Sequence, residues 1–133
     1  MAKLNEIIQW CNQTLKSHEF KDYAPNGLQI EGKQDVNKIL CAVTASQDAI
    51  DAAIEQGADL LLVHHGYFWK GEPYPITGMR GKRIKSLIQH DISLVGYHLP
   101  LDSHPSLGNN AALAEILGLR DIEPLDSNER YPI

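Results

Sequence analysis

The chain has few cysteines, and they do not form a metal-binding or disulfide pattern. Cys11 and Cys41 are the two cysteines among 133 residues, and they lack CxxC spacing. Each lies in an apolar segment, so we expect both to be small core residues of a protein kept in a reducing compartment. The cysteine content therefore favours a cytoplasmic protein and disfavours a disulfide-stabilised secreted domain.

Long apolar runs and basic clusters are also missing. The N-terminal stretch MAKLNEIIQWCNQTL is interrupted by polar residues, and no run reaches the length of a signal sequence or a membrane span. The chain has 12 Lys and Arg against 17 Asp and Glu, which gives a net charge of −5. Long nucleic acid is therefore disfavoured as a partner, although a single nucleotide is not. We expect no membrane partner either.

The common motifs of nucleotide binding and covalent catalysis are absent as well. The sequence contains no GxGxxG fingerprint, no P-loop and no GxSxG elbow, and no cysteine–histidine pair stands at a predicted strand end. Phosphate binding by a glycine-rich loop and catalysis by a serine or cysteine nucleophile therefore have no support in this sequence.

Segments of helical and extended periodicity alternate along the chain. We expect a short strand around Leu28 and Ile30, and strands over 39–44, over 59–63 and from Ile92. Helical spacing predicts helices over 3–16, from a Ser46 cap to Gly57, over 80–90 and over 106–117. This alternation is typical of an α/β fold with a mostly parallel sheet and helices on both faces, in three layers. The length suits one such domain over 1–133.

Two of the predicted helices have clear inward faces. Their apolar side chains are expected to pack on the sheet: Ile84, Leu87 and Ile88 in the third helix, and Leu113, Ile116 and Leu117 in the last. Gly118 is placed to end the last helix. Asn109 and Asn110 precede it, and capping is the favoured role for them over an approach to a functional site.

Polar side chains stand where the predicted parallel strands end. They are Thr44 after the first strand, His64 and His65 after the second, and His98, Asp102 and His104 within YHLPLDSH after the third. The carboxyl ends of parallel strands meet at one edge of a sheet, where open α/β sheets usually bind their ligands. We therefore expect these six residues to gather at that edge.

Imidazole and carboxylate groups at such an edge indicate a metal site. They are suitable ligands for zinc, manganese or iron, whereas an isolated histidine is more often structural. Adjacent residues of a regular strand point to opposite faces, so His64 and His65 converge on one ion only where the strand has ended, which Gly66 permits. Alternatively, each binds a different ion, with Asp102 bridging the two. One or two divalent ions per chain are expected.

The aromatic residues after the histidines have two interpretations. Tyr67, Phe68 and Trp69 are expected to seal a loop over the core or a subunit contact. Stacking on a planar base is the alternative.

Four motifs closely resemble the bacterial members of the Nif-three-like family, often labelled GTP cyclohydrolase I type 2 homologs. They are DYAPNGLQIEG at 22–32, VTAS at 43–46, GADLLLVHHGYFWKG at 57–71 and YHLPLDSHPSLGNN at 97–110. The resemblance runs from Asp22 to Gly118. It implies a cytoplasmic α/β protein that assembles as a ring-shaped homohexamer with two metal ions near its central cavity.

The resemblance also implies roles for individual residues. The family's N-terminal metal ligands fall on His64, His65 and Asp102, while His98 and His104 line the site. Members of the family continue into a second, similar half that supplies a further His and Glu, so residues 1–133 resemble the N-terminal half alone. Apolar faces that pack on the second half are then expected to be exposed and to favour self-association.

These observations lead to one main hypothesis and two alternatives. The main hypothesis is a metal-dependent hydrolase-like protein that acts on an unidentified small substrate, with a nucleotide-like molecule as one candidate. The first alternative is a non-catalytic metal-binding ring that serves as a scaffold or regulator. The second is an inactive chain without a working site.

Overall fold

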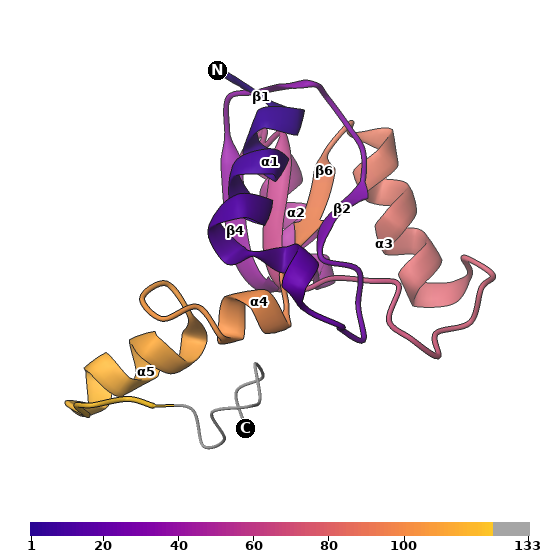
Figure 1. The fold of residues 1–133 in the computed structure, drawn as a ribbon. Coiled ribbons are helices and arrows are strands. Elements are labelled where there is room, and N and C mark those ends of the chain that lie inside the picture. The colour runs from indigo at the N-terminus through magenta and orange to yellow at the C-terminus, as the bar shows by residue number, and fades with distance from the viewer. Residues whose placement is uncertain (124–133) are drawn as a thin grey trace.

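A four-stranded, mostly parallel sheet forms the centre of the fold, as the sequence predicts. The computed structural model describes residues 1–123 (Figure 1). The sheet has the strand order β2-β6-β5-β4, and only the β2–β6 pair is antiparallel. Its strands are β2 (Gly27–Ile30), β4 (Ile39–Thr44), β5 (Leu60–His65) and β6 (Ser93–Gly96), and a separate antiparallel pair joins β1 (Ala2–Lys3) to β3 (Asp35–Val36).

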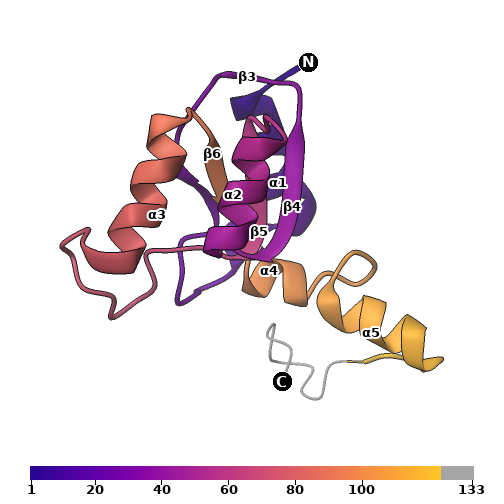
Figure 2. The ribbon, with the colours of Figure 1, turned by 180° about the vertical axis from the view of Figure 1, so that it is seen from behind.

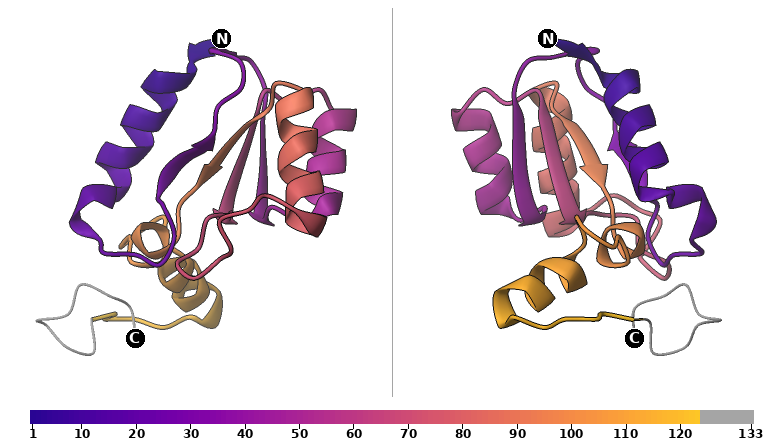
Figure 3. Two further views of the ribbon diagram at one scale, coloured as in Figure 1. Left: turned by 90° about the vertical axis from the view of Figure 1, so that its right-hand side faces the viewer. Right: turned by 60° about the vertical axis from the view of Figure 1, so that its left-hand side comes forward.

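Helices lie on both faces of this sheet (Figures 2 and 3). Those on the faces are α1 (Leu4–Leu15) on one side and α2 (Gln47–Glu55) and α3 (Gly78–Gln89) on the other. A 3-10 turn η1 (Ser17–Glu19) follows α1, and α4 (Leu99–Asp102) and α5 (Asn109–Leu117) lie beyond the end of the sheet (Figure 3). No helix within residues 1–123 has the length and hydrophobicity needed to cross a bilayer.

The central strand β5 separates two apolar cores. Leu60 and Leu61 are both fully buried but point to opposite faces, because side chains alternate along a strand. Leu61 packs with residues of α2 and α3, whereas Leu60 packs under α1 with Leu4 and Cys11. This burial on both sides explains the continuous apolar run of the strand, which is typical of parallel sheets.

The predicted helix ends are confirmed where the sequence has a strong signal. Ser46 caps α2, because its Oγ accepts a hydrogen bond of 3.2 Å from the Ala49 N–H. Gly57 and Gly118 follow α2 and α5 with φ of 64° and 69°. These left-handed conformations favour glycine, and they end the helices at the expected positions.

The predicted inward face of the last helix is wrong. Leu113, Ile116 and Leu117 are 55%, 81% and 62% exposed. The sequence pattern missed the short helix α4, which follows β6 almost directly and leads the chain away from the sheet (Figure 3). As a result, α5 begins at Asn109 beyond the edge of the sheet, away from the strands described within residues 1–123 (Figure 3).

Two further predictions of burial are also wrong. Cys41 is exposed because it lies on the edge strand β4, on the face where α1 packs against residues of β5 and β6. Ile88 is 57% exposed because α3 buries the narrow stripe of Ile84 and Leu87, and Ile88 lies about 100° further round the helix from Leu87.

The buried carboxylate of Asp59 ties together the segments that begin β4 and β5. Its Oδ2 accepts hydrogen bonds from the backbone N–H groups of Asn37 (2.9 Å) and Lys38 (3.2 Å). Its Oδ1 lies 3.2 Å from the Lys33 ammonium. The hydrogen bond from Asn37 and the contacts with Lys33 and Lys38 outweigh burial, so the pKa of Asp59 is lowered. The ionised carboxylate is therefore the form that stabilises this end of the sheet.

Asp59→Asn is expected to lower the free energy of unfolding at pH 7 by about 1–3 kcal/mol, because the single oxygen of an amide cannot replace the two accepting oxygens of the carboxylate. A lowered folded pKa gives stability that is present above the unfolded pKa of about 3.9 and lost as the pH falls through the folded pKa. The difference between wild type and variant should therefore shrink below about pH 4. Urea unfolding across this range tests the prediction, with the exposed Asp51→Asn as control. A difference that stays constant down to the lowest pH would contradict it.

Candidate metal centre

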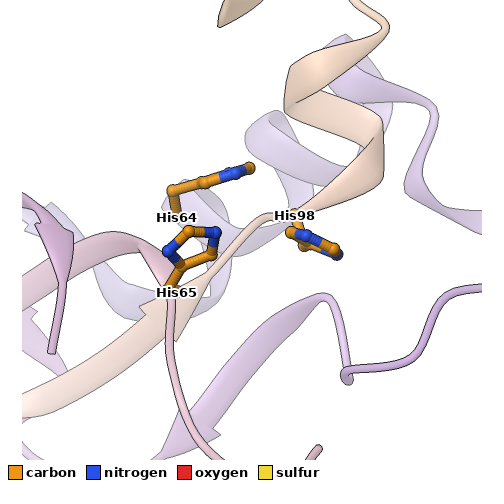
Figure 4. Close-up of side chains that lie close together, drawn as sticks. All are labelled: His64, His65 and His98. Carbon is orange, nitrogen blue, oxygen red and sulfur yellow. The ribbon is translucent and has the colours of Figure 1, made fainter. Parts of the chain in front are cut away.

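Three imidazoles gather at the carboxyl edge of the parallel strands. His64 and His65 end β5, and His98 follows β6 after Tyr97. One possible ligand atom from each of the three lies within 4.8 Å of the others (Figure 4). Nitrogens around a tetrahedral zinc ion are about 3.4 Å apart, so small side-chain rotations would bring the three to bonding positions.

The rings of His64 and His65 approach each other, although the strand does not end before them as expected. That expectation is wrong, because β5 continues through His65, which pairs with Thr44 of β4. The ring centroids of His64 and His65 are nevertheless 4.3 Å apart. Side chains in strands lean along the strand direction, so at the last two positions both rings can extend beyond the end of the sheet.

Hydrogen bonds fix the tautomers of two of these histidines. His64 Nδ1 lies 2.9 Å from the carbonyl oxygen of Tyr97, and His98 Nδ1 lies 2.8 Å from a carboxylate oxygen of Asp22. Since both oxygens only accept, each Nδ1 is the donor. In the neutral form of His98 the lone pair is then on Nε2, which is the arrangement that orients histidine ligands in metal sites, whereas His64 Nε2 also faces an accepting oxygen, Asp102 Oδ1, at 3.4 Å.

The surroundings of the third imidazole favour its neutral form. Burial lowers the pKa of His65, the nearby His64 and His98 lower it further, and the Asp102 carboxylate opposes them. His65 Nδ1 also lies 3.4 Å from the Thr44 hydroxyl. Neutral imidazole is the form that binds metal ions, so this environment favours a ligand role.

Asp102 lies beside the three imidazoles at the end of α4. Its Oδ1 is 3.4 Å from His64 Nε2 and accepts a hydrogen bond of 2.7 Å from the Asn109 amide. The favoured capping role of Asn109 is therefore wrong, and the alternative, an approach to the site, describes its position. The helix N-cap is Gly108, which has no side chain to offer.

His104 lies outside the group of three imidazoles. Its Nδ1 accepts hydrogen bonds from the backbone N–H groups of Leu107 (3.0 Å) and Ser106 (3.3 Å). The imidazole thus shapes the loop between α4 and α5, within which it lies. Of the six residues expected at this edge, the structure brings together His64, His65, His98, Asp102 and Thr44.

Asp22, Asn26 and Trp69 belong to the site but had no role in it in the sequence analysis. Asp22 and Asn26 contact His98, although their segment has only the signal of a turn. The Trp69 ring meets the His98 ring edge to face at 4.8 Å, and its Nε1 donates to the Gly66 carbonyl. Tyr67 is buried against the core, as expected of a residue that seals a loop. The Trp69 ring therefore covers one side of the imidazole group.

The fold and the site define an α/β protein with a histidine and carboxylate cluster at the carboxyl edge of its parallel strands. The chain belongs to the DUF34/NIF3 (NGG1p interacting factor 3) family, whose model matches residues 2–131. A GTP cyclohydrolase 1 type 2 homolog of Neisseria meningitidis serogroup B is 58% identical over 118 residues, which cover 89% of this chain and 47% of the relative.

Solved structures share the same fold. The structure titled protein ybgI, of unknown function, has a TM-score of 0.91 and 53% identity, and the match covers 93% of this chain and 50% of that chain. The protein TTHA1606 from Thermus thermophilus has a TM-score of 0.87 and 42% identity, over 93% of this chain and 51% of that chain. The chain thus spans about half the length of the relatives it matches.

Gly108→Ala is expected to disturb the segment that holds Asp102. A Cβ at position 108 would lie 2.6 Å from the Leu101 carbonyl oxygen and 2.9 Å from that of Asp102, and closer still to that of His104. These are backbone atoms, so α4 or the start of α5 must shift, at a cost of about 1–3 kcal/mol. Thermal unfolding should show a lower midpoint than in the exposed loop variant Ser106→Ala. Equal midpoints would contradict the tight packing of this loop.

Proposed function

We propose that this chain forms part of a metal-dependent hydrolase-like protein in which His64, His65 and Asp102 hold a divalent ion. Zinc, iron and manganese suit this mixture of nitrogen and oxygen donors. The observation that supports the proposal most directly is the group of three imidazoles whose ligand atoms lie within 4.8 Å of one another. In two of them Nδ1 has a hydrogen-bond partner in the protein, and Nε2 is the nitrogen left for a metal ion.

A bound divalent ion would supply the Lewis acidity that activates water near neutral pH. The residues of the chain then have distinct tasks. Tyr97 and Asp22 orient two of the imidazoles, Asn109 orients the Asp102 carboxylate, and Trp69 excludes water from one side of His98. His98, which is 17% exposed at its side chain, is placed to accept a proton or to donate its lone pair.

The substrate class rests on the relatives alone. Their name, GTP cyclohydrolase 1 type 2 homolog, makes a nucleotide-like molecule the first candidate to test. The sequence resemblance implies two ions per chain, and within residues 1–123 only His98 joins the three proposed ligands as a neighbouring donor. We therefore expect one ion to bind to this half-length chain.

Purified wild-type protein is expected to bind about one zinc, iron or manganese ion per chain, measured by elemental analysis and by titration. His64→Ala and Asp102→Ala each remove a proposed ligand and should weaken binding by more than the roughly 10- to 100-fold loss typical of changes to outer partners. His90→Ala is the matched control, because His90 caps α3 away from the site.

Metal content that is equally low in all four proteins would contradict the metal site in this chain. Equal and stoichiometric content in all four would place the ion elsewhere.

The alternative function is a non-catalytic ring that serves as a scaffold or regulator. The exposed apolar side chains of α5 favour it, because Leu113, Ile116 and Leu117 lie on one side of the helix with spacings of three and four residues. Contiguous exposed apolar surface usually marks a contact with another protein surface. We propose that α5 contributes to self-association, with the ring-shaped homohexamer implied by the sequence resemblance as the expected assembly.

Ile116→Lys should shift the protein to smaller species in sedimentation velocity experiments, because a charge would be buried in the contact. Glu115→Lys is the matched control, since it adds a lysine at a neighbouring exposed position that is already polar. An unchanged size distribution in Ile116→Lys would contradict the role of α5.

Turnover separates the two functions. A hydrolase should lose activity in His64→Ala while its assembly stays intact, and a scaffold should show no turnover that depends on His64.

A further inference from the structure

Asp22 makes more contacts around His98 than a turn residue requires. Its side chain is 2% exposed. Oδ1 accepts from His98 Nδ1 at 2.8 Å and from the Tyr23 N–H at 2.6 Å, while Oδ2 accepts from the Leu99 N–H at 2.9 Å and the Asn26 amide at 3.0 Å. The carboxylate thus binds both the imidazole of His98 and the backbone of the residue after it.

This arrangement holds His98 at three points. Asp22 holds the ring nitrogen, the backbone N–H of His98 donates to Asn26 Oδ1 at 2.8 Å, and Trp69 packs against the ring. The ring therefore has little freedom to turn. The other ring nitrogen of His98 is Nε2. The centroid of this ring lies 5.0 Å from that of the His64 ring.

An ionised carboxylate is required for this geometry. Both Asp22 oxygens face donors, and a carboxylate accepts at both, whereas an amide accepts at one oxygen only. An asparagine at position 22 must direct its NH₂ group either at His98 Nδ1 or at the Leu99 N–H and the Asn26 amide. The first orientation forces His98 to carry its proton on Nε2, and the second breaks the contact that holds the start of α4.

We propose that Asp22 is a positioning residue that fixes the Nδ1-protonated tautomer of His98 and so presents Nε2 as a third nitrogen donor beside His64 and His65. The proposal rests on the proposed metal-binding function. It extends that function, because a carboxylate in the DYAPNG turn then positions one of the nitrogen donors of the site. The turn and the strand-end histidines are then one functional unit, although 76 positions separate Asp22 from His98.

The first test measures the tautomer of His98 directly, by long-range ¹H–¹⁵N correlation spectra of the metal-free, histidine-labelled protein at about pH 8, where imidazoles are mostly neutral. Wild-type His98 should show a protonated Nδ1 and an unprotonated Nε2. In Asp22→Asn, the Nε2-protonated form should become populated. His90 is an internal reference, because its Nδ1 bonds to the Ser86 carbonyl at 2.9 Å and should stay protonated in both proteins.

The second test measures metal affinity by zinc titration against a competing chelator. Asp22→Asn should weaken binding by about 10- to 100-fold, the range typical of lost partners of histidine ligands. Asp59→Asn is the matched control, because it removes another buried carboxylate that binds backbone N–H groups but lies at the opposite end of the strands. It should lower stability without changing zinc affinity or the His98 tautomer.

Two results would overturn the proposal. One is a wild-type His98 that carries its proton on Nε2, which is decisive even if Asp22→Asn does not fold. The other is an Asp22→Asn protein that binds zinc as tightly as wild type. If wild type binds no metal, the proposed metal function fails, while the spectra still decide whether Asp22 sets the tautomer of His98.

Discussion

The parallel register of β4, β5 and β6 is the constraint on which the candidate site depends. Val63 pairs with Gly96 and His65 with Thr44, so the three strands finish at the same edge of the sheet. β5 and β6 are hydrogen-bonded to a strand on each side, and side chains at the carboxyl ends of the strands make contacts outside the sheet. Apolar side chains bury both faces of the central strand β5, and its histidines lie at the carboxyl end.

Two buried carboxylates stabilise opposite ends of these strands by the same chemistry. Asp59 binds the segment before β4, and Asp22 binds the start of α4. Burial of a charged group is costly unless its hydrogen bonds are satisfied, and each carboxylate accepts several. Burial raises the pKa of Asp22, but the hydrogen bonds from His98, Asn26 and Leu99 outweigh it and leave the pKa lowered. The difference is that one partner of Asp22 is an imidazole of the site.

The exposed apolar side chains within residues 1–123 include a group on β4 and a group on α5. On the edge strand β4, Ile39 and Val43 are 44% and 69% exposed, on the same face as Cys41. On α5, Ile116 is 81% exposed, and the helix projects beyond the sheet (Figure 1). An α/β layer normally covers such residues with another layer. The chain also spans about half the length of the curated relatives it matches.

The sequence by itself determined the four strands of the main sheet, the helix ends at Ser46, Gly57 and Gly118, and the places of His64, His65 and His98 near the carboxyl ends of the strands, because periodicity and capping are local properties of the chain. The tertiary structure decided which groups these histidines meet. Asp22 meets His98 because the antiparallel pairing of β2 with β6 brings the turn before β2 to the end of β6, and Asn109 meets Asp102 only because α4 turns the chain away from the sheet. Such contacts join segments far apart in sequence, and no local pattern encodes them. The exposure of α5 has the same origin, since an amphipathic pattern shows that a face is apolar but not what covers it.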